Sequence, residues 1–311
     1  MTRATKVKAH RQRQTPPPSR RSPWVERGLF GLAALAVVIL ATALLRLSGG
    51  DQRTSADGPG PVHVHGLGVN PADGALFIAT HTGLFRAREG ESKAVRVGDS
   101  YQDTMGFTVV GANRFLGSGH PDLRQDLPPL LGLIESTDKG RSWEPISLLG
   151  EADFHVLRSV NERVYGYDSS NDRLMMSADA GRTWEEAERP APLVDLAADP
   201  KDSLHVIASG VSDLDQGLYE SGDGGRNWER IGDPVGLLAW PAHDRLFLVD
   251  GGGGVFLSMN AGRRFERRGE IGGQPAALLG QAADELYAAL HDGTIKRSID
   301  GGVTWTVRST P

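Results

Sequence analysis

Hydrophobic residues fall into short runs that alternate with turns rich in Gly, Asp and Asn, from about residue 62 onward. Such runs predict β-strands joined by tight turns, and no long stretch of helical period occurs in this region. Six units each begin with one run, at residues 65–69, 105–109, 154–157, 194–198, 235–239 and 276–279. A second run follows in each unit, at residues 75–78, 114–116, 163–165, 204–207, 245–248 and 285–287.

A turn motif, Ser-x-Asp-x-Gly-x-x-Trp, recurs in the last five units, with Asn and Phe replacing Asp and Trp in one copy. Successive opening serines are 41, 44, 37 and 40 residues apart. The motif residues are Ser136, Asp138, Gly140, Trp143, Ser177, Asp179, Gly181, Trp184, Ser221, Asp223, Gly225, Trp228, Ser258, Asn260, Gly262, Phe265, Ser298, Asp300, Gly302 and Trp305. A fixed period of this length indicates one supersecondary unit used many times.

We interpret the motif as a structural cap on a β-hairpin. The Asp accepts hydrogen bonds from backbone amides of its own turn, the Gly supplies a positive φ, and the aromatic ring covers the turn. The first unit has lost the motif, because residues 84–89 stand in its place. Six four-stranded units of this size predict an all-β six-bladed β-propeller over residues 62–311.

The N-terminal region has a different composition. Residues 1–27 carry eight Lys or Arg and one Glu, which predicts a disordered basic tail. Residues 28–45 contain no charged residue, so we expect a transmembrane helix or uncleaved signal anchor over 28–47 and a linker over 48–61. The positive flank predicts a single-pass bacterial cell-membrane protein with a cytoplasmic N-terminus and an extracytoplasmic propeller. A cleaved signal peptide is the alternative, since Ala41-Thr-Ala43 resembles a cleavage site.

Net charge and cysteine content limit the classes of binding partner and of covalent cross-link that we expect. The whole chain has a formal net charge of −5 despite its basic tail, so the predicted propeller is acidic and nucleic acid is not expected to bind. Cysteine is absent, which excludes a disulfide framework.

Histidine and aspartate are unevenly distributed among the six units. In the first three they lie at the start of the first strand or after the second, positions that share one face of a propeller. These candidate ligand-binding residues are His63, His65, His81, Asp103, His120, Asp122, Asp153 and His155. The last three units lack this pattern, so the repeat does not require it. Imidazole and carboxylate groups bind divalent metals, for which we select His63, His65 and His120, or they act as acid–base groups around a polar ligand.

The repeated motif resembles the Asp-box of the sialidase-type BNR repeat over about residues 60–311. The segments His63-Val-His65-Gly-Leu-Gly-Val-Asn-Pro, Ala79-Thr-His81-Thr-Gly-Leu-Phe and Ser118-Gly-His120-Pro-Asp122 resemble bacterial membrane-anchored, glycosyl-hydrolase-like Asp-box proteins. The Phe/Tyr-Arg-Ile-Pro motif of true sialidases is missing, so we do not expect sialidase chemistry. Two hypotheses remain. The first is a binding or assembly propeller that takes a metal, glycan or protein ligand at a His/Asp-lined funnel. The second is a glycoside hydrolase acting on cell-surface or extracellular glycans.

Overall fold

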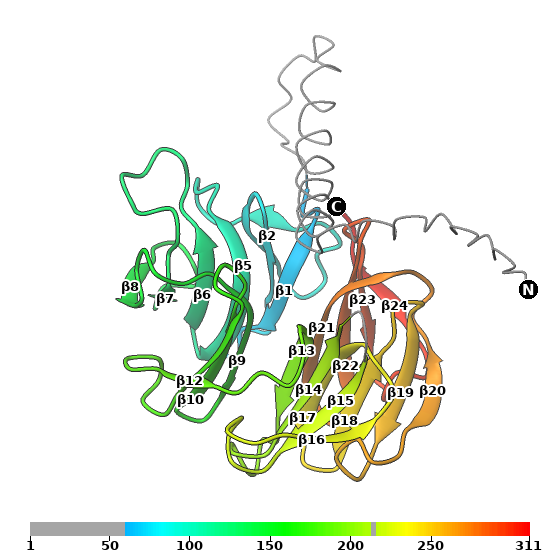
Figure 1. Ribbon diagram of the computed structural model, residues 1–311. Coiled ribbons are helices and arrows are strands. Elements are labelled where there is room, and N and C mark those ends of the chain that lie inside the picture. The colour runs from blue at the N-terminus through cyan, green and yellow to red at the C-terminus, as the bar shows by residue number, and fades with distance from the viewer. Residues whose placement is uncertain (1–59, 213–215) are drawn as a thin grey trace, which may run out of the picture. The chain divides into compact units, whose positions relative to one another are not determined.

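The computed structural model describes residues 60–212 and 216–311 of the chain. These residues form six four-stranded antiparallel sheets, and each sheet is built from four strands that are consecutive in the sequence. The predicted six-bladed propeller is therefore confirmed (Figure 1).

The first three blades contain β1 (Val64–Val69), β2 (Leu76–Thr80), β3 (Gly83–Ala87), β4 (Val95–Arg96), β5 (Asp103–Gly111), β6 (Arg114–His120), β7 (Leu133–Ser136), β8 (Glu144–Ser147), β9 (Phe154–Val160), β10 (Arg163–Asp168), β11 (Arg173–Ser177) and β12 (Glu185–Ala187). The last three contain β13 (Leu193–Ala198), β14 (Val206–Val211), β15 (Gln216–Ser221), β16 (Glu229–Gly232), β17 (Leu237–Ala242), β18 (Arg245–Val249), β19 (Gly254–Ser258), β20 (Glu266–Glu270), β21 (Pro275–Ala282), β22 (Glu285–Leu290), β23 (Ile295–Ser298) and β24 (Thr306–Ser309).

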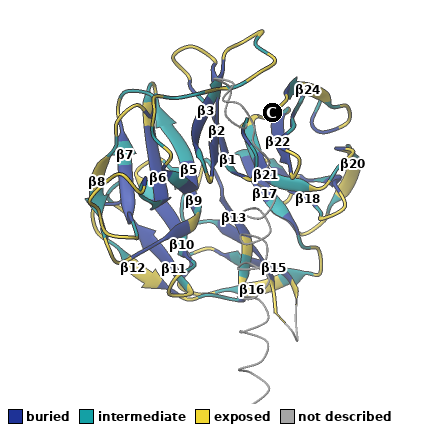
Figure 2. Ribbon diagram, turned by 90° about the horizontal axis from the view of Figure 1, so that it is seen from above, coloured by how far each residue is buried: buried dark blue, intermediate teal, exposed yellow. Residues whose placement is uncertain are grey.

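The first strand of each blade faces the axis of the ring. These inner strands contact one another in the cyclic order β1, β5, β9, β13, β17 and β21, and β21 contacts β1. Figure 2 shows the sheets arranged in a ring, with buried residues mainly in the inner strands and exposed residues in the connecting loops and in outer strands such as β12 and β20. A closed ring protects the edges of the sheets from pairing with other chains.

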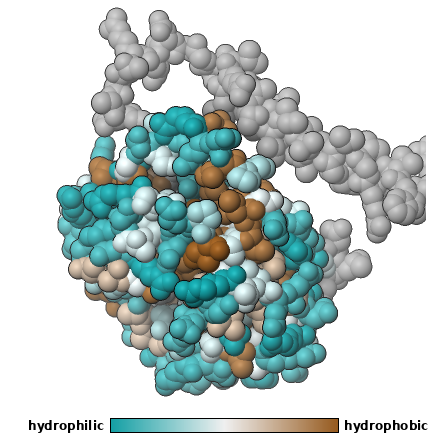
Figure 3. All heavy atoms as spheres, turned by 90° about the vertical axis from the view of Figure 1, so that its left-hand side faces the viewer, coloured by the Kyte–Doolittle hydropathy of each residue, from teal (hydrophilic) through white to brown (hydrophobic). Residues whose placement is uncertain are grey.

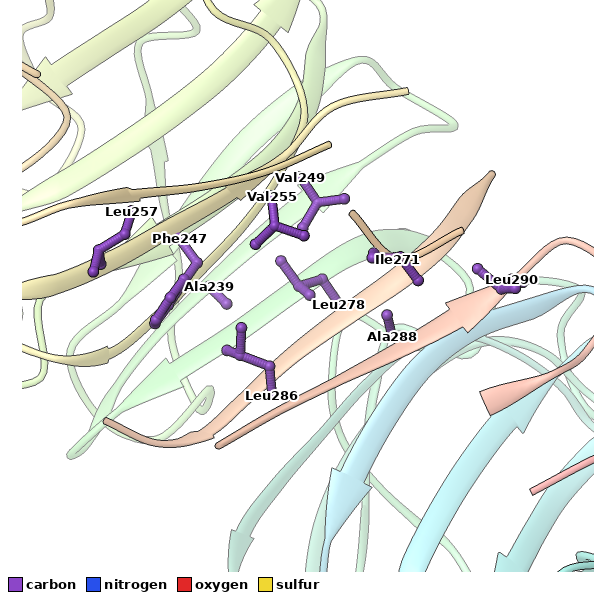
Figure 4. Close-up of a cluster of buried hydrophobic side chains, with 10 residues drawn as sticks. All are labelled: Ala239, Phe247, Val249, Val255, Leu257, Ile271, Leu278, Leu286, Ala288 and Leu290. Atoms are coloured by element: carbon purple, nitrogen blue, oxygen red, sulfur yellow. The ribbon is translucent and has the colours of Figure 1, made fainter. Parts of the chain in front are cut away.

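Hydrophobic side chains fill the space between neighbouring blades. The cluster in Figure 4 joins Phe247 and Val255 of the fifth blade to Leu278 and Leu286 of the sixth. Phe247, Val255 and Leu286 are fully buried. Burying a side chain of this size contributes about 1.5–3 kcal/mol, so these interfaces are the main source of stability. The side of the molecule that faces the viewer in Figure 3 is mainly hydrophilic, with hydrophobic patches among the polar residues.

The repeated turns have the hydrogen bonds expected of a hairpin cap. In the second blade, Gly140 N donates to Ser136 Oγ at 2.8 Å, and Ser142 N donates to Asp138 Oδ1 at 2.9 Å. The bond from the Gly amide to the Ser hydroxyl recurs in all five copies. The aromatic ring of each copy packs against a cluster of buried hydrophobic residues.

These turns lie on the face that also carries the hairpin between the first and second strands. Lys139 N donates to Asn113 O in its own blade, and Lys139 Nζ lies 2.7 Å from Asp73 in the preceding blade. The same kind of backbone bond joins Ala180 to Glu162 and Gly224 to Leu204. The predicted histidine-rich positions lie at the opposite ends of these strands.

The expectations for residues 1–27, 28–47 and most of 48–61 fall outside the described residues. Across 60–212 and 216–311, no helix has the length and apolar character needed to cross a bilayer.

Candidate metal and ligand site

A cavity of about 570 Å³ lies on the axis of the propeller, between the inner strands of all six blades. Its lining includes His65 of β1, His155 of β9, Val194 of β13 and Leu237 of β17. This volume is within the range of small-molecule sites, and two of the candidate histidines, His65 and His155, line it.

A β-bulge in the inner strand positions two of these histidines. Val64 pairs with Thr80 and Gly66 with Ala79, so His65 is the extra residue of β1. Phe154 pairs with Asp168 and Val156 with Tyr167, so His155 is the extra residue of β9. Bulges re-aim side chains next to functional sites.

The bulge recurs in other blades, but the type of its extra residue differs from blade to blade. The inner strands of the second, fourth and sixth blades have a bulge at the same place, where the extra residues are Met105, Val194 and Ala276. The repeat therefore supplies a local backbone geometry that only the first and third blades use to present imidazole.

The first cluster joins His65, His81 and Asp103. One ligand atom from each residue lies within 4.8 Å of the others. Within residues 60–212 and 216–311, this is the group of His, Asp or Glu side chains whose ligand atoms are close enough together to hold a metal ion. Nδ1 of His81 lies 2.9 Å from both carboxylate oxygens of Asp103. A neutral His81 therefore donates from Nδ1 and keeps a lone pair on Nε2. The His65 and His81 rings meet edge to face with centroids 4.2 Å apart.

The two imidazoles of this cluster have opposite electrostatic environments. Burial, followed by the charge of His81, lowers the pKa of His65 to about 4. The hydrogen bond to Asp103 raises the pKa of His81. Nε2 of His65 is buried without a hydrogen-bond partner among the described residues. At neutral pH, His65 thus presents an uncharged, unpaired ring nitrogen, as a metal ligand requires.

His63 borders the same cluster. Its ring centroid lies 5.7 Å from that of His81, and its side chain is exposed. Its backbone has a φ of 55°, in the left-handed region that few residues other than Gly occupy. His63 is not in the group with metal-ligand spacing, so of the three metal ligands that the sequence favoured only His65 is in it.

The remaining candidates separate into two groups. His120, Asp153 and His155 lie together, because Oδ2 of Asp153 is 2.8 Å from Nε2 of His155 and 3.5 Å from Nε2 of His120. Asp122 instead binds the Arg124 guanidinium and accepts a hydrogen bond from Tyr101 N at 2.8 Å. Arg124 holds the pKa of Asp122 well below its usual range. The contacts of Asp122 thus anchor the long loop after β6.

Sequence reasoning did not foresee the polar contacts of two other buried aspartates. Asp195 of β13 is buried and bound to Arg158 of β9 at 2.6 Å, and its burial raises its pKa. His205 and His243 both approach the buried Asp199. The His243 contact crosses from the fifth blade to the fourth, a pairing that no short-range pattern reveals.

Comparisons with known proteins support the fold. Residues 132–251 match the family model described as "Sortilin, neurotensin receptor 3". A search of curated proteins found no match.

Solved structures match more of the chain. The GH74 enzyme of Niastella koreensis is 15% identical, with a TM-score of 0.57, over 80% of this chain and 45% of that one. The GH74 xyloglucanase from Xanthomonas campestris is 18% identical, with a TM-score of 0.53, over 82% of this chain and 46% of that one. A chain of a nidogen/laminin complex is 14% identical, with a TM-score of 0.59, over 76% of this chain and 93% of that one.

This chain spans less than half the length of either GH74 enzyme. Identities this low establish shared architecture and leave activity open. With the sheet topology, these matches identify the described part of the chain as a six-bladed β-propeller.

Proposed function

We propose that this protein is a binding propeller that takes up a divalent transition-metal ion at the mouth of its central cavity, through His65, His81 and Asp103. The observation that carries the proposal is the spacing of these three side chains, whose ligand atoms lie within 4.8 Å of one another. Two imidazoles and one carboxylate suit zinc and similar ions. Three protein ligands also leave a coordination position open for an external ligand, such as a group on a glycan or protein.

The residues fit such an ion in two further respects. Bonds of about 2.1 Å in tetrahedral geometry place ligand atoms about 3.4 Å apart, so small side-chain rotations would complete the site. Asp103 would either bind the ion directly or orient His81, because a metal-binding histidine commonly donates its other N–H to a carboxylate.

Zinc titration of the metal-stripped full chain by calorimetry tests the proposal. We expect His65→Ala and His81→Ala each to weaken zinc binding by about 100-fold or more. His291→Ala is the matched control, because His291 is exposed and follows the second strand of the sixth blade as His81 follows that of the first. Equal zinc affinity in wild type and both cluster variants would reject the site.

Asp103→Asn separates the two roles of Asp103. The amide oxygen still accepts the hydrogen bond from His81 Nδ1, so an orienting role predicts a loss of about 10- to 100-fold. Loss of a direct, charged ligand predicts a larger effect, comparable to His81→Ala.

We further propose that residues 28–47 anchor the propeller on the outer side of a bacterial cell membrane. The uncharged run over residues 28–45 and the basic flank before it support this topology. Protease treatment of intact cells should degrade the propeller of an anchored protein. Release of a shortened chain into the medium would favour the cleaved signal peptide.

The glycoside hydrolase hypothesis remains an alternative with a separate test. The two carboxylates beside the histidines, Asp103 and Asp153, are each paired with an imidazole, which supports binding over glycosidic acid–base chemistry. Cleavage of chromogenic glycosides that disappears in Asp103→Asn and Asp153→Asn would reverse this preference.

A further inference from the structure

The axial cavity has a charge character that the metal site does not explain. Among the described residues, the titratable side chains that line it are His65, His155, Arg158 and Asp195. The side chain of Asp195 is only 3% exposed, whereas those of Arg158 and His155 are 31% and 38% exposed. The titratable groups that a molecule in the cavity can reach are therefore basic, although the chain as a whole has a net charge of −5. A cavity of this kind attracts anions.

The guanidinium of Arg158 has more donors than its protein contacts use. Its Nε donates to Leu196 O at 3.0 Å, its Nη1 to Leu157 O at 3.1 Å and its Nη2 to Asp195 Oδ1 at 2.6 Å. A guanidinium carries five N–H groups, two of them on each terminal nitrogen. One N–H on Nη1 and one on Nη2 therefore have no partner among the described residues. Donors of this type form strong, charge-assisted hydrogen bonds to carboxylate groups.

Asp195 holds this guanidinium in place, although its own carboxylate is buried. Oδ1 of Asp195 also accepts a hydrogen bond from Leu196 N at 2.7 Å, and Oδ2 accepts one from Leu238 N at 2.9 Å. The pair thus fixes Arg158 of the third blade against the fourth and fifth blades. A side chain that is already fixed loses little conformational entropy when it binds a ligand. Because Asp195 offsets part of the charge of Arg158, a singly charged ligand is a better match than a dianion.

Arg158 lies deeper in the cavity than the metal site. It follows His155 by three residues along β9, which is about 10 Å at 3.3 Å per residue. Apolar side chains such as Val156 and Leu237 also line the cavity. We propose that the axial cavity binds a small monocarboxylate with an apolar body, whose carboxylate group accepts hydrogen bonds from Arg158. This anion site is separate from the metal site and does not need the metal.

Benzoate is a suitable probe, because it joins one carboxylate to an apolar ring. Its binding to the metal-stripped full chain is followed by ligand-observed NMR. We expect Arg158→Gln to weaken benzoate binding by about 10- to 100-fold, because charged hydrogen bonds are lost. Arg173→Gln is the matched control and should bind benzoate as wild type does. Arg173 is also 31% exposed and paired with a buried aspartate, Asp168, but it does not line the cavity.

Arg158→Gln leaves the buried Asp195 without its cation, so circular dichroism checks that each variant is folded. If this variant does not fold, Arg158→Gln is combined with Asp195→Asn, which replaces the buried ion pair by two amides. Arg173→Gln combined with Asp168→Asn is then the control. The folded double variant at Arg158 should lose benzoate affinity, and its control should keep it.

Three results would overturn the anion site. They are the absence of benzoate binding to wild type, equal affinity in wild type and the Arg158 variants, and an equal loss in the Arg173 control. Benzoate binding that requires zinc and disappears in His81→Ala would assign the carboxylate to the metal, which overturns the Arg158 site and leaves the proposed function intact. Loss of zinc binding in a chain that still binds benzoate through Arg158 would do the reverse.

Discussion

At the scale of single residues, the repeated turns depend on an acidic side chain bonded to its own loop. In the fourth blade, Asp223 accepts hydrogen bonds from the side chain and backbone of Asn227, which lower its pKa to about 2. Asp179 and Asp300 have the same shift, caused mainly by Thr183 and Thr304 respectively. Because the carboxylate form is the bonded form, each turn is weakened when its Asp is protonated.

We predict that these turns contribute to acid unfolding. A depressed pKa stabilises the fold above the ordinary Asp pKa of 3.8, and the contribution is lost as pH falls through about 2. Asp223→Asn should therefore make the free energy of unfolding less dependent on pH between about 4 and 2, as measured by urea titration at each pH.

The fifth blade offers the reciprocal variant, because Asn260 already occupies the acidic position there. Asn260→Asp should make the same pH dependence steeper. If neither substitution changes it, the turn carboxylates do not contribute to acid unfolding.

At the scale of elements, the β5–β6 hairpin controls both strand pairing and the position of Asp103. Asp103 pairs with His120 and Thr104 with Gly119, next to the bulge of β5. Gly119 has a φ of 137°, and a Cβ there would lie 2.1 Å from the carbonyl oxygen of Asp103. The strand pair thus requires a glycine beside the site.

We predict that Gly119→Ala destabilises the fold by at least about 2 kcal/mol, because backbone strain and overpacking add. It should also weaken zinc binding, because the displaced carbonyl belongs to Asp103. Gly90→Ala is the control, since Gly90 has a φ of 81° but no atom within 4 Å of an added Cβ. Gly90→Ala should lower the free energy of unfolding by only about 1 kcal/mol and should leave zinc affinity unchanged. If both variants change zinc affinity equally, the proposed link between Gly119 and Asp103 is wrong.

At the scale of the whole propeller, Arg308 of the last blade helps to join it to the first. Its guanidinium donates to the carbonyl oxygens of Ala87, Arg88 and Glu91. Thr310 N donates to Ser92 O at 2.9 Å, which adds a backbone contact across the same junction. Each blade consists of consecutive strands, so ring closure depends on contacts of this kind and on the hydrophobic clusters between blades.

We predict that Arg308→Ala lowers the free energy of unfolding by about 1–2 kcal/mol, because three carbonyl oxygens, two of them in partly buried contacts, lose a charged donor. Amide hydrogen exchange of Thr310 should become faster. Arg264→Ala is the control, as its side chain is 78% exposed, and it should change stability by less than about 0.5 kcal/mol. Unchanged exchange at Thr310 would mean that Arg308 does not secure the closure.

The blade count and the structural turns were predictable from the sequence, because both depend on short-range order. Alternating runs reveal strands, and a turn such as Ser136 to Trp143 forms its hydrogen bonds within itself. The sequence predicted that histidines gather on one face of the first three blades, but it did not predict which of these side chains contact one another. The pairing of His81 with Asp103 and of His120 with Asp153 joins neighbouring blades, and a one-residue bulge sets which way His65 points.

The sequence by itself determined the six-unit repeat, the hairpin caps and the gathering of His63, His65, His81, His120 and His155 on one face of the first three blades. Only the tertiary structure decided which of these residues meet. Contacts between blades depend on how six sheets pack and twist around one axis. A local sequence pattern does not determine the distances between side chains of different blades. This is why Asp122 proved to be a loop anchor, while His65, His81 and Asp103 form the group with metal-ligand spacing.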